Sequence, residues 1–137
     1  MLTFSIVTPD GVTYQDDVDQ VTIPTTKGHV TILPGHIPLV AILAPGELIA
    51  KKKDYEVPLA VSGGILEVRP GNVIYVLADT AERAEHIDVE RAETARQRAE
   101  ELMKQQHATD DVEFARLQAK IEKELARVRV GKKYRKL

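Results

Sequence analysis

Residues 73–98, VIYVLADTAERAEHIDVERAETARQR, decide the fold because the hydrophobic repeat changes within them. Residues 73–78 alternate as the two faces of a buried strand do. Further along, Ile87, Ala92, Ala95 and Ala99 recur at helical spacing. The sequence therefore predicts that a sheet ends and a helix begins within residues 79–86.

The residues on either side of this joint differ in composition. All seven prolines and seven of the eight glycines precede residue 72, whereas 26 of the 40 charged residues lie from Glu82 onward. We therefore predict two parts, residues 1–84 and residues 85–137. The absence of cysteine excludes disulfides and thiolate metal sites. Neither a signal peptide nor an eighteen-residue apolar run is present, so a soluble protein is expected.

The first part has the pattern of a small all-β domain. Runs of about five residues separated by Gly, Pro and Asp turn signals are typical of an antiparallel β-sandwich. The strands are expected at residues 2–6, 18–23, 29–33, 39–43, 48–50, 55–61, 65–68 and 73–78. Gly63 and Gly64 lie between the runs at residues 55–61 and 65–68. They match neither phosphate-binding glycine motif, so a bulge or a close strand crossing is favoured at this point.

The second part is predicted to be an antiparallel helical hairpin. Asp88 is a candidate N-cap for a helix that ends near residue 105. A second helix is expected to begin at a capping box formed by Asp110 and Glu113, and to end at Gly131. Its apolar stripe is expected to comprise Phe114, Leu117, Ile121, Leu125 and Val128. The predicted fold class is thus α+β, a sandwich followed by a two-helix hairpin.

The seam of this hairpin is predicted to be weak on the side of the first helix. Its alanines offer single methyl groups, each worth about 0.8 kcal/mol when buried, against a backbone entropy cost on the order of 1 kcal/mol per ordered residue. One hypothesis is a hairpin that exchanges between docking sites. The alternative, a hairpin docked permanently on the sandwich, is equally compatible with the pattern.

Charge is distributed unevenly along the chain. The net charge is −4 over residues 1–81, −5 over residues 82–115 and +7 over residues 116–137. The basic end would be attracted to an acidic surface, although a solvated face without a partner explains it equally well. Arg91 and Arg98 are seven residues apart and share one helix face, where their guanidinium groups could bind a polyphosphate. By spacing alone, ion pairs with acidic residues of the same helix are the simpler explanation for these arginines.

Three motifs in order resemble the epsilon subunit of bacterial and chloroplast F-type ATP synthases. They are the loop Pro34-Gly35-His36 with its apolar flanks, the strand containing Ser62-Gly63-Gly64, and Ile87-Asp88-Val89-Glu90-Arg91-Ala92 at the start of the helices. The resemblance spans nearly the whole chain. The residues before Ile32 and the tail at 132–137 depart from the family pattern.

The resemblance implies a noncatalytic subunit of the central stalk, peripheral to the cytoplasmic face of the bacterial plasma membrane. Its sandwich would contact the gamma subunit and the c-ring through the loop of Pro34, Gly35 and His36. Its hairpin would extend to the alpha/beta catalytic head and inhibit ATP hydrolysis. The acidic partner there would meet Arg116, Lys120, Lys123 and Arg127.

The resemblance also implies a regulatory ligand, although no cofactor is required. In several family members ATP binds the folded hairpin without being hydrolysed. By position, the resemblance implies that ATP would contact Glu82, Ile87, Asp88, Arg91, Ala92 and Arg98, with Lys120, Lys123 and Arg127 of the second helix as candidates to complete the site.

Two other classes of function remain as alternatives. A sandwich with a basic helical arm could bind nucleic acid, but the arm lacks aromatic residues for base stacking other than Tyr134. An enzyme is disfavoured because no nucleophile, base and orienting acid have a recognisable spacing. His29 and His36 lack further metal ligands nearby and are expected to be structural.

Overall fold

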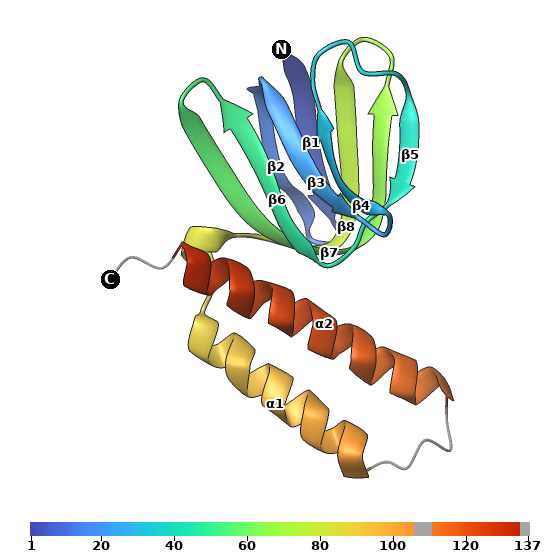
Figure 1. Ribbon diagram of the computed structural model, residues 1–137, viewed down its shortest axis with the longest axis vertical. Helices are drawn as coiled ribbons and strands as arrows, with labels where there is room; N and C mark the ends of the chain where they lie inside the picture. The colour runs from blue at the N-terminus through green and yellow to red at the C-terminus, as the bar shows by residue number, and fades with distance from the viewer. Residues whose placement is uncertain (106–110, 135–137) are drawn as a thin grey trace.

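The computed structural model describes residues 1–105 and 111–134, which form a β-sandwich with a helical hairpin beneath it (Figure 1). This confirms the predicted α+β class. The strands are β1 (Leu2–Thr8), β2 (Gly11–Val18), β3 (Gln20–Thr25), β4 (Gly28–Ile32), β5 (Leu39–Ile42), β6 (Gly46–Lys52), β7 (Tyr55–Arg69) and β8 (Val73–Arg83). A short 3-10 helix, η1 (Ala84–His86), leads into α1 (Val89–Gln105) and α2 (Asp111–Lys133).

The long hairpin of β7 and β8 joins the two layers of the sandwich. The strand order is β2-β1-β8-β7-β6-β3-β4, and β5 pairs with β7 off this path. The first half of β7 pairs with β6 and its second half pairs with β5, so β7 crosses from one layer to the other. The pairs are antiparallel except for β1 with β8, which are parallel.

The crossing point lies at Gly63 and Gly64, where the sequence predicts a break between two strands. That prediction is wrong, because β7 is continuous and its register with β8 is the same before and after the glycines. A bulge is therefore absent here. A Cβ on Gly64 would lie 1.8 Å from the carbonyl oxygen of Leu77, and both glycines have positive φ. The glycines permit a close strand crossing, the second of the two expectations.

Other strand bounds differ from the predictions, and β2 (Gly11–Val18) is not among the predicted strands apart from Val18. The single strand expected at residues 18–23 is divided at Asp19, whose N–H donates to the carbonyl oxygen of Lys51. Strand β8 continues to Arg83 instead of ending near residue 78, because residues 80–83 pair with residues 59–62 of β7. Polar side chains in this extension hid it from a search for alternating apolar residues.

The sandwich has a hydrophobic core of its own. This cluster draws on residues 2–78 and includes no residue of the helices. Its largest fully buried side chains include Phe4, Ile6, Leu48, Leu59 and Ile74. Because the cluster is complete within the strands, the sandwich does not need the hairpin in order to bury its interior.

The hairpin docks through α2, which lies between the sandwich and α1 (Figure 1). At the start of α1 the predicted N-cap is confirmed, because the Arg91 N–H donates to Asp88 Oδ1 at 3.0 Å. The predicted capping box of the second helix involves Asp110, which lies outside the described residues. None of the helices in the described ranges is both long and apolar enough to cross a membrane.

Helix α2 continues through Gly131, where the sequence predicts its end. A Cβ at this position would lie 2.6 Å from Val89 Cγ2 and 3.0 Å from Ile87 Cγ2. The glycine therefore permits close packing of the two helices at their root, and it does not act as a C-cap.

The expected apolar stripe of α2 is only partly buried. Leu117 and Val128 are buried, whereas Phe114 and Leu125 are exposed. Glu124, Ala126 and Val130 are buried as well. Helix α2 contacts both α1 and the sandwich, so it has two buried faces. A single apolar stripe with a 3.6-residue period predicts only one of these faces.

Candidate functional site

A cleft lies between the sandwich and both helices of the hairpin. Its volume is about 660 Å³. Its floor is formed by β7 and β8, where the hydroxyl groups of Ser62 and Thr80 are hydrogen-bonded to each other. The lining residues that bear charge or can acquire it are Glu82, His86, Asp88, Arg91, Lys120, Lys123, Glu124 and Arg127.

Four cations of the hairpin line this cleft, namely Arg91, Lys120, Lys123 and Arg127. Arg91 comes from the first turn of α1, whereas the other three come from α2. On the opposite wall stands Glu82, near the end of β8. The helical side of the cleft thus carries these cations together with the carboxylates of Asp88 and Glu124, and the sandwich side carries hydroxyl groups and the Glu82 carboxylate. The cations suit an anion that also bears polar groups.

Arg127 bridges the sandwich and the hairpin within the cleft. Its guanidinium donates to the carboxylate of Glu82 at 2.9 and 3.3 Å, and to Glu124 at 2.9 Å. Burial acts to lower the pKa of Arg127, but the hydrogen bonds and charges of the two carboxylates outweigh it and leave the pKa raised. Arg127 therefore remains charged and links α2 to β8 through ion pairs.

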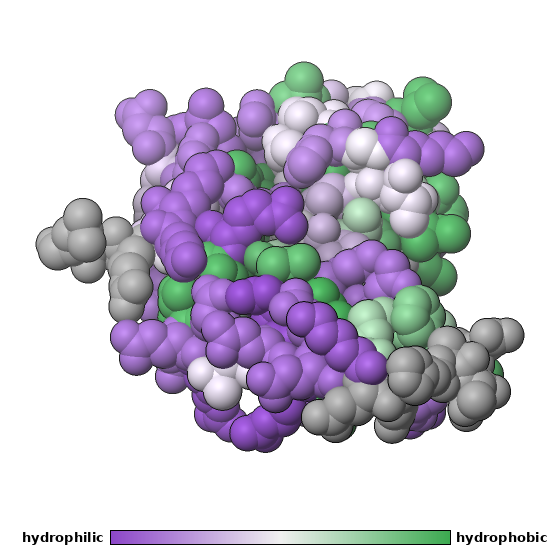
Figure 2. Space-filling view, turned by 60° about the horizontal axis from the view of Figure 1, so that its bottom comes forward, coloured by the Kyte–Doolittle hydropathy of each residue, from purple (hydrophilic) through white to green (hydrophobic). Residues whose placement is uncertain are grey.

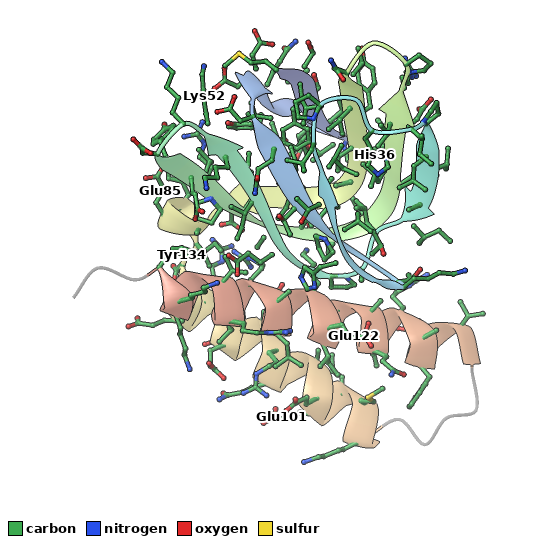
Figure 3. All side chains as sticks on the ribbon, turned by 45° about the horizontal axis from the view of Figure 1, so that its top comes forward. His36, Lys52, Glu85, Glu101, Glu122 and Tyr134 are labelled. Atoms are coloured by element: carbon green, nitrogen blue, oxygen red, sulfur yellow. The ribbon has the colours of Figure 1, made fainter. Side chains whose placement is uncertain are left out.

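A second polar contact fastens the C-terminal end of α2. Lys133 Nζ donates to both carboxylate oxygens of Glu47 on β6, at 3.2 and 3.0 Å, and the Tyr134 hydroxyl donates to the same carboxylate. Glu47 raises the pKa of Lys133, chiefly through this hydrogen bond. Burial, followed by the hydrogen bond to Glu47, raises the pKa of Tyr134. Figure 3 shows Tyr134 at this junction.

The apolar part of the docking contact is small. A cluster of Ala60, Ala84 and Val130 is buried, with Ile87 and Tyr134 packed at its margin. The two alanine methyl groups and one valine contribute on the order of 4 kcal/mol, to which Ile87 and Tyr134 at the margin add. The outward surface of the hairpin is largely hydrophilic (Figure 2). Polar contacts therefore carry much of the docking.

The structure brings together only part of the set expected to contact ATP. Glu82, Asp88 and Arg91 line the cleft, whereas Ile87, Ala92 and Arg98 do not. Ile87 and Ala92 instead pack with Val89 and Val128 between the two helices.

Other cleft residues escaped the sequence search. Ser62, Thr80 and Glu124 were missed because short polar groups on a strand, and one glutamate among many on a helix, carry no distinguishing pattern. The unbroken pairing of β7 with β8 places Ser62 opposite Thr80.

An intrahelical ion pair forms next to the cleft at Arg96, and not at Arg91 or Arg98 among the ion pairs of the described residues. Arg96 donates to Glu93 and, at 2.9 Å, to Glu100 within α1. Arg96 is therefore engaged in a local ion-pair network and is not among the residues that line the cleft.

The loop that contains Pro34, Gly35 and His36 lies between β4 and β5, at the end of the sandwich away from the helices (Figures 1 and 3). The Gly35 N–H donates to Asn72 Oδ1 at 2.7 Å, which ties this loop to the turn between β7 and β8. Of the basic residues expected to meet an acidic partner, Arg116 and Lys120 are exposed, and Lys123 and Arg127 are half-buried.

A line of apolar side chains crosses the outer face of the β5-containing layer. Ile42 pairs with Ile65, Ile65 with Leu77, Leu77 with Val7, and Val7 with Val12. Four of these five residues are exposed, for example Ile42 at 62% and Leu77 at 48%. We call these five residues the apolar row. In Figure 2 hydrophobic surface gathers on the side of the sandwich where Figure 1 places β5.

Comparisons with known proteins match both parts of the chain. Residues 1–84 match the family described as ATP synthase, Delta/Epsilon chain, beta-sandwich domain. Residues 85–132 match ATP synthase, Delta/Epsilon chain, long alpha-helix domain. The chain is 44% identical over 127 residues to the ATP synthase epsilon chain of Herpetosiphon aurantiacus, covering 93% of this chain and 91% of the relative. The Bacillus licheniformis protein of the same name is 44% identical over 131 residues, with 96% and 98% coverage.

Solved structures show the same fold. A chain from the Euglena gracilis mitochondrial ATP synthase, in a structure of its OSCP/F1/c-ring, superposes with a TM-score of 0.76 at 24% identity. The match covers 91% of this chain and 78% of that one. These findings favour a subunit of an ATP synthase complex over a nucleic-acid-binding protein. On the strength of the family matches and the identity across more than nine-tenths of its length, the chain belongs to the ATP synthase epsilon chain family.

Proposed function

We propose that the chain is a noncatalytic rotor subunit of a proton-translocating F-type ATP synthase, bound peripherally at the cytoplasmic face of a bacterial plasma membrane. Its sandwich would couple rotation to the c-ring through the Pro34-Gly35-His36 loop. Its hairpin would inhibit ATP hydrolysis when it leaves the sandwich and reaches the alpha/beta head. The observation that carries this proposal is the independent core of the sandwich beside a hairpin held by little apolar area.

ATP is the proposed ligand of the cleft, where it would be bound without hydrolysis. Arg91, Lys120 and Lys123 would donate hydrogen bonds to the phosphates, and Asp88 or Glu82 would accept hydrogen bonds from the ribose or the base. Because residues of the sandwich and of both helices line the cleft, a ligand there stabilises the docked hairpin and no other state. By linkage, ATP therefore shifts the hairpin toward docking.

Arg91→Ala is expected to weaken ATP binding to the isolated chain by about 10- to 100-fold, because it removes a charge-assisted hydrogen bond to a phosphate. The matched control is Arg98→Ala, which removes the same charge from the same helix outside the cleft lining. Its affinity is expected to stay within about twofold of that of the parent chain. Isothermal titration calorimetry measures both variants.

The outcome separates two readings of the site. Equal losses in the two variants would support the positional set that includes Arg98 and would contradict the cleft geometry. If ATP produces neither binding heat nor a shift in melting temperature with the unsubstituted chain, the proposal that ATP binds the cleft is wrong.

We propose that the apolar row is the face on which the gamma subunit packs. A row that crosses five strands presents a continuous apolar strip, and such a strip on a subunit of a complex is suited to a protein interface. Leu77→Glu should weaken gamma binding about 100-fold, because the interface would bury an unpaired charge. The sandwich should still fold, since Leu77 is 48% exposed.

Binding to purified gamma subunit tests this prediction, with circular dichroism as the check on folding. Thr31→Glu introduces the same charge at an exposed position of β4, in the other layer, and is expected to leave gamma binding unchanged. If both variants bind gamma as the parent chain does, the row is not the interface.

A further inference from the structure

Two carboxylates of the sandwich hold α2, and only one of them belongs to the cleft. Glu82 accepts from Arg127 inside the cleft, where an anionic ligand would compete for the guanidinium. Glu47 accepts from Lys133 and Tyr134 and is not among the residues that line that cleft. The two contacts are therefore separable: one is exposed to the ligand and the other is not.

The position of Glu47 places this second contact at the root of the hairpin. Glu47 lies on β6 opposite Ala60 of β7, and Ala60 belongs to the small apolar cluster on which Val130 and Tyr134 pack. The Glu47 side chain is only 18% exposed, whereas the Lys133 side chain is 57% exposed. A partly dehydrated carboxylate that accepts from both a cation and a phenol is strongly favoured in the docked state.

We propose that Glu47, Lys133 and Tyr134 form a latch that sets how much of the hairpin is docked in the absence of nucleotide. This inference rests on the mobile hairpin of the proposed function. The ligand acts through the cleft, whereas the latch determines the equilibrium on which the ligand acts. Loss of the latch therefore raises the undocked population in the free chain, and ATP is still able to reverse the change.

Distance measurements on the full chain test the latch. The chain has no cysteine, so spin labels attach only at Asp54→Cys, in the β6–β7 turn, and Gln97→Cys, on the exposed side of α1. In this background Glu47→Gln and Tyr134→Phe are each expected to raise the undocked fraction at least threefold without ATP. Glu67→Gln is the matched control, because Glu67 bonds Arg69 within β7. It should leave the distribution unchanged.

A charge swap makes the test specific to the pair. Glu47→Lys places two ammonium groups together and should undock the hairpin, whereas addition of Lys133→Glu restores a salt bridge and should recover docking. The latch is overturned if Glu47→Gln and Glu67→Gln give the same undocked fraction as the parent chain. The proposed ATP response fails separately, if ATP leaves the undocked fraction of Glu47→Gln unchanged while that fraction exceeds the control's.

Discussion

Deletion of residues 87–137 is expected to raise ATP hydrolysis by the assembled enzyme about tenfold, the change that follows if nine complexes in ten are held in an inhibited state. The truncated chain should still assemble, because the core of the sandwich contains no hairpin residue and the apolar row and the Pro34-Gly35-His36 loop remain. ATPase activity and ATP-driven proton pumping, measured on the same membranes, test the two parts of this expectation.

Proton pumping distinguishes loss of inhibition from loss of coupling between hydrolysis and proton transport. If hydrolysis rises and pumping rises with it, the hairpin acts only as an inhibitor. If hydrolysis rises while pumping falls, the deletion has uncoupled the rotor, and the sandwich alone does not suffice. Unchanged hydrolysis would contradict the inhibitory role altogether.

Gly64→Ala is expected to destabilise the sandwich by about 2–5 kcal/mol. The φ of +116° costs an alanine roughly 1–2 kcal/mol, and overpacking typically adds about 1–3 kcal/mol. The new methyl group would meet the Leu77 carbonyl oxygen and the Ala78 Cα, both of which belong to the backbone of β8. Neither is able to move without breaking the pairing of the two layers. Urea unfolding followed by circular dichroism measures the loss.

Gly71→Ala isolates the contribution of the close contact. Gly71 also has positive φ, at +85°, but a Cβ there meets nothing within 4 Å. Its substitution should therefore cost only the conformational strain, about 1–2 kcal/mol. Equal losses at the two positions would mean that the crossing of β7 over β8 relaxes to accommodate a side chain, contrary to the geometry described above.

The class of fold was predictable because it depends on repeats that the sequence displays directly. Alternation at residues 73–78, helical spacing after Ile87 and the cap at Asp88 all correspond to elements of the structure. Sequence reasoning failed where one residue type serves opposite purposes. Gly131 marks a helix end in isolation, yet here it makes room for Ile87 and Val89 of the neighbouring segment.

The site was less predictable than the fold, because it depends on contacts between distant segments. From its position in the helical pattern, Arg127 would be expected to be exposed. In the structure it forms ion pairs with Glu82, forty-five positions away, and with Glu124. The pair of Glu47 with Lys133 joins residues eighty-six positions apart. Neither periodicity nor local spacing reveals such contacts. To predict them, one must first know how α2 packs against strands β6 and β8.

The attachment of the hairpin at its root has a mechanical consequence. The chain enters α1 at the same end at which Val130 and Tyr134 pack on the sandwich, so tether and fastening lie close together. Helix α1 has 17 residues, a length of about 25 Å. A tilt of roughly 20° about that end would displace its far end by roughly 9 Å, given such a length. The hairpin is thus a lever, and a small tilt at its attachment moves its tip much farther than its root.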